Sequence, residues 1–429
     1  MLEFQLAILY FVFLIQAFVK FGVFNGYSIF LLTTGLFNFM KIFLSWMIGD
    51  NYREAYSLIH IDLPENVVQE MLILYSSFSV ALHCTYMFFW EKWHVKFESE
   101  HKKISIDNSL LKLGKQVMLI FSIFAIWRCY IEIGYILKNG QLIYLEGSSG
   151  IPIPFFVRLF CIFFQVGYMM VLASLPPKRV FFKYSLFYLL TQLPYVLIGL
   201  RGVFVVVILF ILWYLYTIYD YKISLKKILL PAAAFIIFLQ IVAITRVGEE
   251  MSQSVFMLLP LFLTSQSQSM YVLALYIQYK DAIMEHNYPF VLDTLIGWMT
   301  GKDGQSLEVL EARSSLGHQL VYSLNPDYYF SGMSLGTTNV AELYEFGILG
   351  VIIGGILYAI FLAKFMIKVK YSRTWLLLSF FLFSSIALAP RGGYFPSLYS
   401  FIRLLIVYFV IVIFDKIIHG KPLRIKLFR

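Results

Sequence analysis

Charged residues are scarce in this sequence. Asp, Glu, Lys and Arg make up 14% of its 429 residues, whereas 60% are apolar and the mean hydropathy is +0.77. A soluble enzyme domain or a disordered chain carries far more charge than this. Cysteine is also rare, and Cys84, Cys129 and Cys161 all lie in apolar runs, which favours buried apolar side chains over a disulfide framework or a metal set. The composition therefore predicts an all-α integral membrane protein.

Several motifs of soluble and nucleotide-dependent enzymes are missing. The sequence contains no Asp-x-Asp, no phosphate loop, no Gly-x-Gly-x-x-Gly, no Cys-x-x-Cys and no His-Glu-x-x-His. Each of these patterns holds a nucleotide, a metal ion or a dinucleotide. Their absence removes support for metal-dependent use of nucleotide sugars, for ATP hydrolysis and for zinc chemistry. We accordingly predict no cofactor and no metal.

Apolar runs long enough to cross a bilayer as helices occur eleven times. The predicted spans are residues 4–19, 28–48, 67–90, 115–137, 153–175, 184–200, 202–219, 228–245, 345–363, 374–389 and 398–414. Eight spans lie within 1–245, a long loop covers 246–344, and 345–429 holds three spans and a basic tail. A loop of this length without repeats or low complexity is usually functional.

The basic residues predict the orientation of the spans. With alternating sides, one set of loops and the tail carries 22 Lys and Arg residues, whereas the short loops on the other side carry 4. Cytoplasmic loops are the ones enriched in Lys and Arg, so the N-terminus is predicted outside and the C-terminus inside. Membrane topology then accounts for most of the net charge of +9, and we predict no nucleic-acid partner.

Residues 255–277 are apolar enough to form a twelfth span. Crossing there would move the basic loop at 364–373 and the basic tail to the outside, against the charge rule. It would also bury the five polar residues 265–269 in the membrane. We therefore predict an interfacial or re-entrant pair of short helices, broken near Pro260 and the Ser/Gln run.

Seven cations are predicted at the outer level of the membrane, where few are expected. They are Lys41, Arg128, Arg158 and Arg403 inside spans, and Arg201, Arg246 and Arg391 at the outer ends of spans. One interpretation is that each side chain snorkels to the headgroups, with Arg128 paired to Glu132 and Arg246 to its acidic neighbours. The other is an outward-facing cavity for phosphate or pyrophosphate, whose oxygens guanidinium groups bind in pairs.

Two of these arginines stand beside glycines. Arg201 lies in the turn Gly199-Leu200-Arg201-Gly202 between two predicted spans, which places it at the membrane surface. Arg391 lies in Pro390-Arg391-Gly392-Gly393, where the glycines permit a close approach of the backbone to a ligand.

The end of the long loop carries the most specific motifs. Residues 314–326 contain His-x-x-x-Tyr-x-x-Asn-Pro, and residues 332–347 contain Gly-x-x-x-Gly-Thr-x-x-x-Ala-Glu-Leu-Tyr-x-x-Gly, which leads into a glycine-rich helix. With Arg201, Arg246 and the late large loop, these motifs resemble the Wzy polymerases of O-antigen and related surface polysaccharides. The Arg-x10-Gly repeats described for some Wzy proteins are absent, so their paired capture-and-release scheme is not carried over.

The resemblance implies a fold like that of C-type glycosyltransferases and an enzyme of the inner membrane that acts on its outer face. It would transfer the growing glycan from undecaprenyl pyrophosphate to a new lipid-linked repeat unit, with a Wzz-type chain-length regulator as partner. Developing charge on the leaving pyrophosphate would be stabilised by Arg128, Arg158, Arg201, Arg246, Arg391 and Arg403. His318 or Glu342 could act as general base, and Tyr322 and Tyr344, with Tyr328 and Tyr329, could contact glycan.

Two alternatives remain open from the sequence. A flippase of lipid-linked oligosaccharides also needs a basic cavity, although the odd span count, the missing inverted repeat and the long loop argue against a carrier. An O-antigen ligase shares the architecture, but the His-Asn element of that family before the post-loop helix is missing, and Thr338, Asn339 and Glu342 occupy the region.

Overall fold

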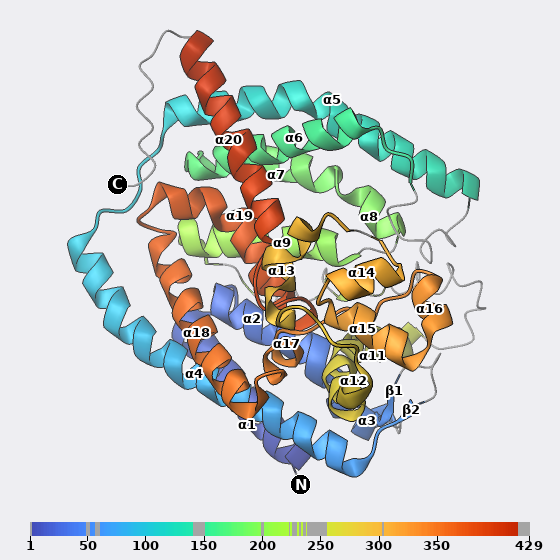
Figure 1. The fold of residues 1–429 in the computed structure, drawn as a ribbon. Helices are drawn as coiled ribbons and strands as arrows, with labels where there is room; N and C mark the ends of the chain where they lie inside the picture. The colour runs from blue at the N-terminus through green and yellow to red at the C-terminus, as the bar shows by residue number, and fades with distance from the viewer. Residues whose placement is uncertain are drawn as a thin grey trace. The chain divides into compact units, whose positions relative to one another are not determined.

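The computed structural model is almost entirely helical (Figure 1). It describes residues 2–48, 52–55, 61–139, 151–198, 201–222, 255–302 and 304–418, together with positions 224, 230, 233–234 and 237. Within these residues the only sheet is a pair of two-residue antiparallel strands, β1 (Glu54–Ala55) and β2 (Ile61–Asp62).

Seven described helices are long and apolar enough to cross a membrane. They cover Leu2–Phe21, Gly26–Ser45, Glu65–Glu100, Asn108–Tyr135, Phe155–Ala173, Gly347–Lys368 and Arg373–Arg391. Each coincides with a predicted span, as expected when apolar length alone decides where a helix forms in lipid. The chain is thus a multi-pass helical membrane protein, and the total of eleven spans stays a prediction.

The remaining predicted spans differ from single long helices. The span at 184–200 is interrupted, because α7 (Lys178–Leu190) ends before α8 (Leu193–Ile198) begins. The span predicted at 202–219 coincides with a shorter apolar helix, α9 (Arg201–Ile218), and the span predicted at 398–414 coincides with α20 (Leu398–Ile418). Apart from four positions, the span predicted at 228–245 lies outside the described residues.

The chain forms two compact units. The first contains Met1–Lys92, Tyr219–Ala363 and Ser385–Pro396, and the second contains Trp93–Ile218, Lys364–Ser384 and Ser397–Arg429. The three predicted divisions 1–245, 246–344 and 345–429 describe membrane topology and stay a prediction.

The first unit begins with helices packed through aromatic side chains. Its N-terminal elements are α1 (Leu2–Phe21), α2 (Gly26–Thr34), the π-helix η1 (Gly35–Phe39), α3 (Met40–Ile48) and most of α4 (Glu65–Glu100). Tyr27 of α2 stacks on Tyr86 of α4 with ring centroids 3.9 Å apart. Gly35 starts η1 where a Cβ atom would lie 2.0 Å from the Tyr10 hydroxyl, so a side chain is excluded there.

The remainder of the first unit consists mainly of short helices. In chain order they are α11 (Val255–Gln266), η4 (Ser267–Ser269), α12 (Met270–Tyr279), η5 (Lys280–Ala282), η6 (Phe290–Leu292), α13 (Asp293–Ile296), η7 (Gly297–Thr300), α14 (Leu307–Ala312), α15 (Leu316–Leu324), α16 (Pro326–Phe330), α17 (Asn339–Tyr344), α18 (Gly347–Lys368) and η8 (Ala389–Arg391). The predicted break in 255–277 occurs at the Ser/Gln run, where η4 separates α11 from α12. The expectation of a second break at Pro260 is wrong, because this proline lies inside α11.

The second unit is a bundle of longer helices. It contains α5 (Asn108–Asn139), α6 (Phe155–Ala173), α7, α8, α9, most of α19 (Arg373–Leu388) and α20. The backbones of α5 and α6 approach closely, since a Cβ atom on Gly114 would lie 2.8 Å from the Val171 nitrogen. Small residues permit such packing between membrane helices.

The cysteines differ in part from the prediction. Cys129 and Cys161 are half-buried, whereas Cys84 is exposed on α4, within one of the seven candidate spans. A small apolar side chain is tolerated on such a surface because lipid, and not water, is the expected neighbour.

Candidate functional site

Glu342 lies on the short helix α17, directly before the spanning helix α18. The Thr338 hydroxyl caps α17 by accepting a hydrogen bond from the Ala341 backbone nitrogen at 3.0 Å. Gly347, with φ +66°, makes the turn into α18 because a left-handed backbone favours glycine. The glutamate side chain is 3% exposed, so the motif turns it into the protein and away from solvent.

The carboxylate of Glu342 is held by a distant segment of the chain. The Tyr394 backbone nitrogen donates to Oε2 at 2.8 Å, although the two residues are 52 positions apart. A Cβ atom on Gly393 would lie 3.2 Å from Oε1 of Glu342 and 2.8 Å from Cγ2 of Thr294. The glycine at 393 was expected to let the backbone approach a ligand. In the structure it lets the backbone approach the Glu342 carboxylate.

Burial raises the pKa of Glu342 to about 8. The Tyr394 N–H and the nearby Thr337 hydroxyl favour the charged form, and the negative charges of Asp293 and Glu345 oppose it. Desolvation outweighs the stabilising contacts because little of the side chain reaches water. A carboxyl group with this pKa exchanges its proton near neutral pH, as a general acid or base requires.

Arg391 lies three residues before Tyr394 and joins several elements of the first unit. Its Nη1 atom donates to Oε1 of Gln266 at 3.1 Å, and its guanidinium lies 5.7 Å from the ring centroid of Phe37. The helix η8, which ends at Arg391, packs against α17. The short segment 391–394 thus begins with Arg391 and ends with Tyr394, whose backbone contacts Glu342. It links two residues that were predicted for different roles.

Polar contacts join three parts of the segment 288–313, which precedes α17 in the chain. Arg313 donates to both carboxylate oxygens of Asp293, at 2.8 and 3.3 Å, and the Tyr288 hydroxyl donates to the same carboxylate at 2.9 Å. This bidentate ion pair fixes the segment around Arg313 relative to α13, where Asp293 lies. The sequence analysis missed these residues, because nothing near them in the chain indicates their partners.

Glu345 makes two contacts in the same region. It lies 2.9 Å from Nε2 of His286 and accepts from the Phe290 backbone nitrogen at 2.7 Å. Glu345, which follows α17 directly, therefore ties the end of this helix to η6 and to His286.

The two motif segments of the loop are pressed together. A Cβ atom on Gly317 would lie 2.2 Å from the Gly336 carbonyl oxygen, and the Leu335 nitrogen donates to the Gly317 carbonyl at 3.4 Å. His318 follows Gly317 on α15, half-buried, with its ring 5.7 Å from that of Tyr329. The helices α15 and α17 both contact α12, which places His318 and Glu342 on neighbouring elements (Figure 1).

The tyrosines predicted for glycan contact lie apart. The Tyr344 hydroxyl donates to Glu70 on α4 at 2.5 Å, and its ring packs edge-on against Tyr276. Tyr322 packs against Tyr329 and Phe330 in the loop. Tyr328 packs against that cluster.

The predicted cations divide between the two units. In the first unit, Lys41 lies 5.1 Å from the ring centroid of Tyr271 on α12, whereas Arg391 contacts Gln266 at the end of α11. Arg246 lies outside the described residues, and Arg201 starts α9 with its side chain outside them. A single cavity lined by all seven cations therefore stays a prediction.

The other three cations lie in the second unit. Arg128 lies 3.3 Å from the Glu132 carboxylate and 4.9 Å from the ring centroid of Tyr195, in agreement with the pairing interpretation. Arg158 is exposed and donates to the Ile153 carbonyl at 3.1 Å. Arg403 is also exposed and lies 5.2 Å from the ring centroid of Tyr399.

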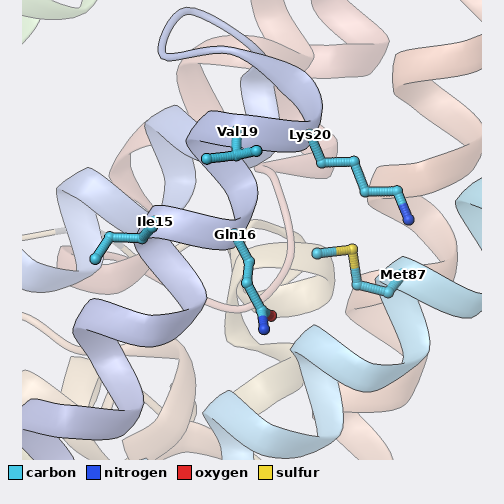
Figure 2. Close-up of a pocket in the computed structure, with 5 residues that line it drawn as sticks. All are labelled: Ile15, Gln16, Val19, Lys20 and Met87. Carbon is cyan, nitrogen blue, oxygen red and sulfur yellow. The ribbon is translucent and has the colours of Figure 1, made fainter.

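A pocket of 460 Å³ opens elsewhere, between α1 and α4. Figure 2 shows Gln16 and Lys20 projecting from α1 toward Met87 on α4, with Ile15 and Val19 completing the lining. Oε1 of Gln16 lies 2.8 Å from Nε2 of His83, whose other ring nitrogen is hydrogen-bonded to Tyr27 at 2.7 Å. No predicted site residue lines this pocket, and no described group of three or more His, Cys, Asp and Glu side chains could hold a metal ion.

The motif-bearing loop and the apolar helices belong to one protein family. A family model described as O-antigen polysaccharide polymerase Wzy matches residues 1–421, nearly the whole chain. The chain belongs to this family. No curated protein and no solved structure matches it.

Membership confirms the resemblance that the loop motifs predicted. It identifies the protein as a polymerase of O-antigen repeat units, of the glycosyltransferase type. The family works on lipid-linked oligosaccharides in membranes, which agrees with the seven apolar helices. Polymerisation is thereby favoured over the flippase and ligase alternatives.

Proposed function

We propose that this protein elongates the glycan on the outer face of the inner membrane, by transfer from undecaprenyl pyrophosphate to a new lipid-linked repeat unit. The observation that carries the proposal is the contact between the segment 391–394 and Glu342. This segment carries the Arg391 guanidinium, which is suited to pyrophosphate, and the Tyr394 N–H that holds the buried carboxyl group of Glu342, which is suited to proton transfer.

The reaction needs one bond to form and one to break. A hydroxyl oxygen at the non-reducing end of the acceptor unit attacks the anomeric carbon of the donor glycan. The bond from that carbon to the pyrophosphate oxygen breaks, and its electron pair leaves with the carrier pyrophosphate. Ionised Glu342, or His318, accepts the hydroxyl proton, and Arg391 stabilises the negative charge that develops on the leaving group.

The other predicted residues support this scheme. Arg158, Arg201, Arg246 and Arg403 would supply further positive charge for the pyrophosphate, whereas Arg128 is already paired with Glu132. Tyr322 and Tyr344 would contact glycan. The predicted eleven-span topology, with the N-terminus periplasmic, the C-terminus cytoplasmic and 246–344 outside, would place the loop on the side where the glycan grows. A Wzz-type chain-length regulator is the proposed partner, and no metal is required.

Reconstitution tests the proposal. Purified protein supplied with a lipid-linked repeat unit and a chelator should produce a ladder of longer lipid-linked glycans on a gel. Arg391→Ala and Arg201→Ala should each abolish the ladder, because the leaving group loses its stabilising charge. The matched control is Arg179→Ala, an exposed arginine in a predicted cytoplasmic loop, which should retain elongation. A wild-type protein that never elongates, with or without a chain-length regulator, would refute the proposal.

A further inference from the structure

Arg391 belongs to η8 and contacts two further elements of the first unit, α11 and η1. It ends the 3-10 turn η8, donates to Gln266 at the end of α11, and lies over Phe37 in the π-helix η1. The π-helix η1 also packs directly against both η4 and η8. The Arg391 side chain therefore lies close to three segments that are not regular α-helix, the π-helix η1 and the 3-10 turns η4 and η8.

The irregular segments η1 and η4 are joined by a side-chain hydrogen bond. The Ser267 hydroxyl of η4 donates to the Leu36 carbonyl of η1 at 2.7 Å, which satisfies a backbone oxygen inside the π-helix. Irregular backbone at membrane depth persists only where protein or a cavity satisfies its polar groups. π-Helices and broken helices recur at ligand sites for this reason.

The partner of Arg391 is neutral. The Gln266 amide group donates to the Ser265 hydroxyl at 3.3 Å, which turns the amide oxygen toward Arg391. Among the described residues, no carboxylate pairs with Arg391, and its side chain is exposed. A guanidinium has five N–H donors, so one bond to an amide orients the group and leaves its charge and other donors available.

We propose that Gln266 is a positioning residue that presents Arg391 to the diphosphate of a polyprenyl-linked substrate. The inference rests on the function proposed above and adds Gln266, at the end of α11, to its site. A neutral partner is essential to it, because a glutamate at the same place would pair with Arg391 and compete with the anionic ligand. Gln266 acts through Arg391 and does not itself touch the reacting atoms.

A pair of nearly isosteric variants tests the assignment. Gln266→Glu should raise the KM for the lipid-linked donor about tenfold and also lower kcat, since an ion pair now occupies the guanidinium that binds the donor and stabilises the leaving group. Gln266→Met, which removes the hydrogen bond but adds no charge, should raise KM less. A residue with a merely structural role would give the opposite order, because a glutamate strengthens the contact with Arg391. The control is Gln278→Glu, the same change near the C-terminal end of α12, which should leave KM unchanged.

Direct binding separates this inference from the proposed function. Decaprenyl diphosphate in detergent should bind the wild-type protein about tenfold more tightly than Gln266→Glu, in line with the KM change. Equal binding by both proteins would overturn the role of Gln266, even if the wild-type protein elongates glycans. Phosphatidylglycerol micelles that bind as tightly as decaprenyl diphosphate would identify a phospholipid headgroup as the ligand and would overturn the assignment to a diphosphate.

Discussion

At the scale of single residues, Glu342 shows how burial changes chemistry. A glutamate in an open loop would be fully ionised at neutral pH, but this one is packed against Gly393 and receives the Tyr394 N–H. Its pKa of about 8 follows chiefly from the loss of water around it. The folded protein therefore holds a proton there that the unfolded chain would release.

That proton makes stability depend on pH. The pKa of Glu342 is raised from 4.5 in the unfolded chain to about 8 in the folded protein, so the folded state binds more protons between these values. The free energy of unfolding should decrease as pH rises from about 4.5 to about 8 and then level off. Glu342→Gln should remove this decrease and lower elongation by about a hundredfold or more, since no base remains at that place.

Two measurements check this prediction. Thermal unfolding in detergent across pH 5 to about 9 should slope downward for the wild-type protein and less steeply for Glu342→Gln. Elongation by the ladder assay gives the second readout. Full activity in Glu342→Gln would leave His318 as the proposed base.

At the scale of elements, glycines decide how the loop helices meet. Gly317 lets α15 approach the segment that carries Gly336, and a methyl group there would collide with backbone, which cannot rotate away. The pattern of glycines was visible in the sequence. Their pairing was not, because it needs two segments whose separation in the chain carries no signal of contact.

Gly317→Ala should accordingly destabilise the loop by about 1–3 kcal/mol, since the two motif segments must separate to admit the new Cβ. Limited proteolysis of residues 280–345 should become faster, and elongation should fall with it. Gly134→Ala in α5 is the matched control, because nothing lies within 4 Å of its added Cβ and alanine suits a helix. Equal proteolysis of the two variants would contradict the close packing.

Helix boundaries show a similar division. Apolar runs predicted the spanning helices, because length and hydropathy act locally. The same criterion could not predict that the run at 184–200 divides into α7 and α8, or that Pro260 continues a helix. Those outcomes depend on neighbours that satisfy the freed backbone groups.

At the scale of the whole molecule, the proposed topology can be tested directly. Thr300→Cys, in a background with Cys84, Cys129 and Cys161 replaced by serine, should react with a membrane-impermeant maleimide in intact spheroplasts. Lys370→Cys, in a predicted cytoplasmic loop, should react only after lysis. The reverse pattern would overturn the orientation derived from the basic residues.

The family, the membrane class and the identity of the candidate residues were accessible from the sequence alone. Hydropathy, charge bias and short motifs are properties of residues that are neighbours in the chain, so they can be recognised without knowledge of the fold. Only the tertiary structure decided which candidates meet. It joined Glu342 to Tyr394 across 52 positions and Arg391 to Gln266 across 125. Such contacts depend on how whole helices pack, and packing is set by the shape of many side chains together and by no single motif.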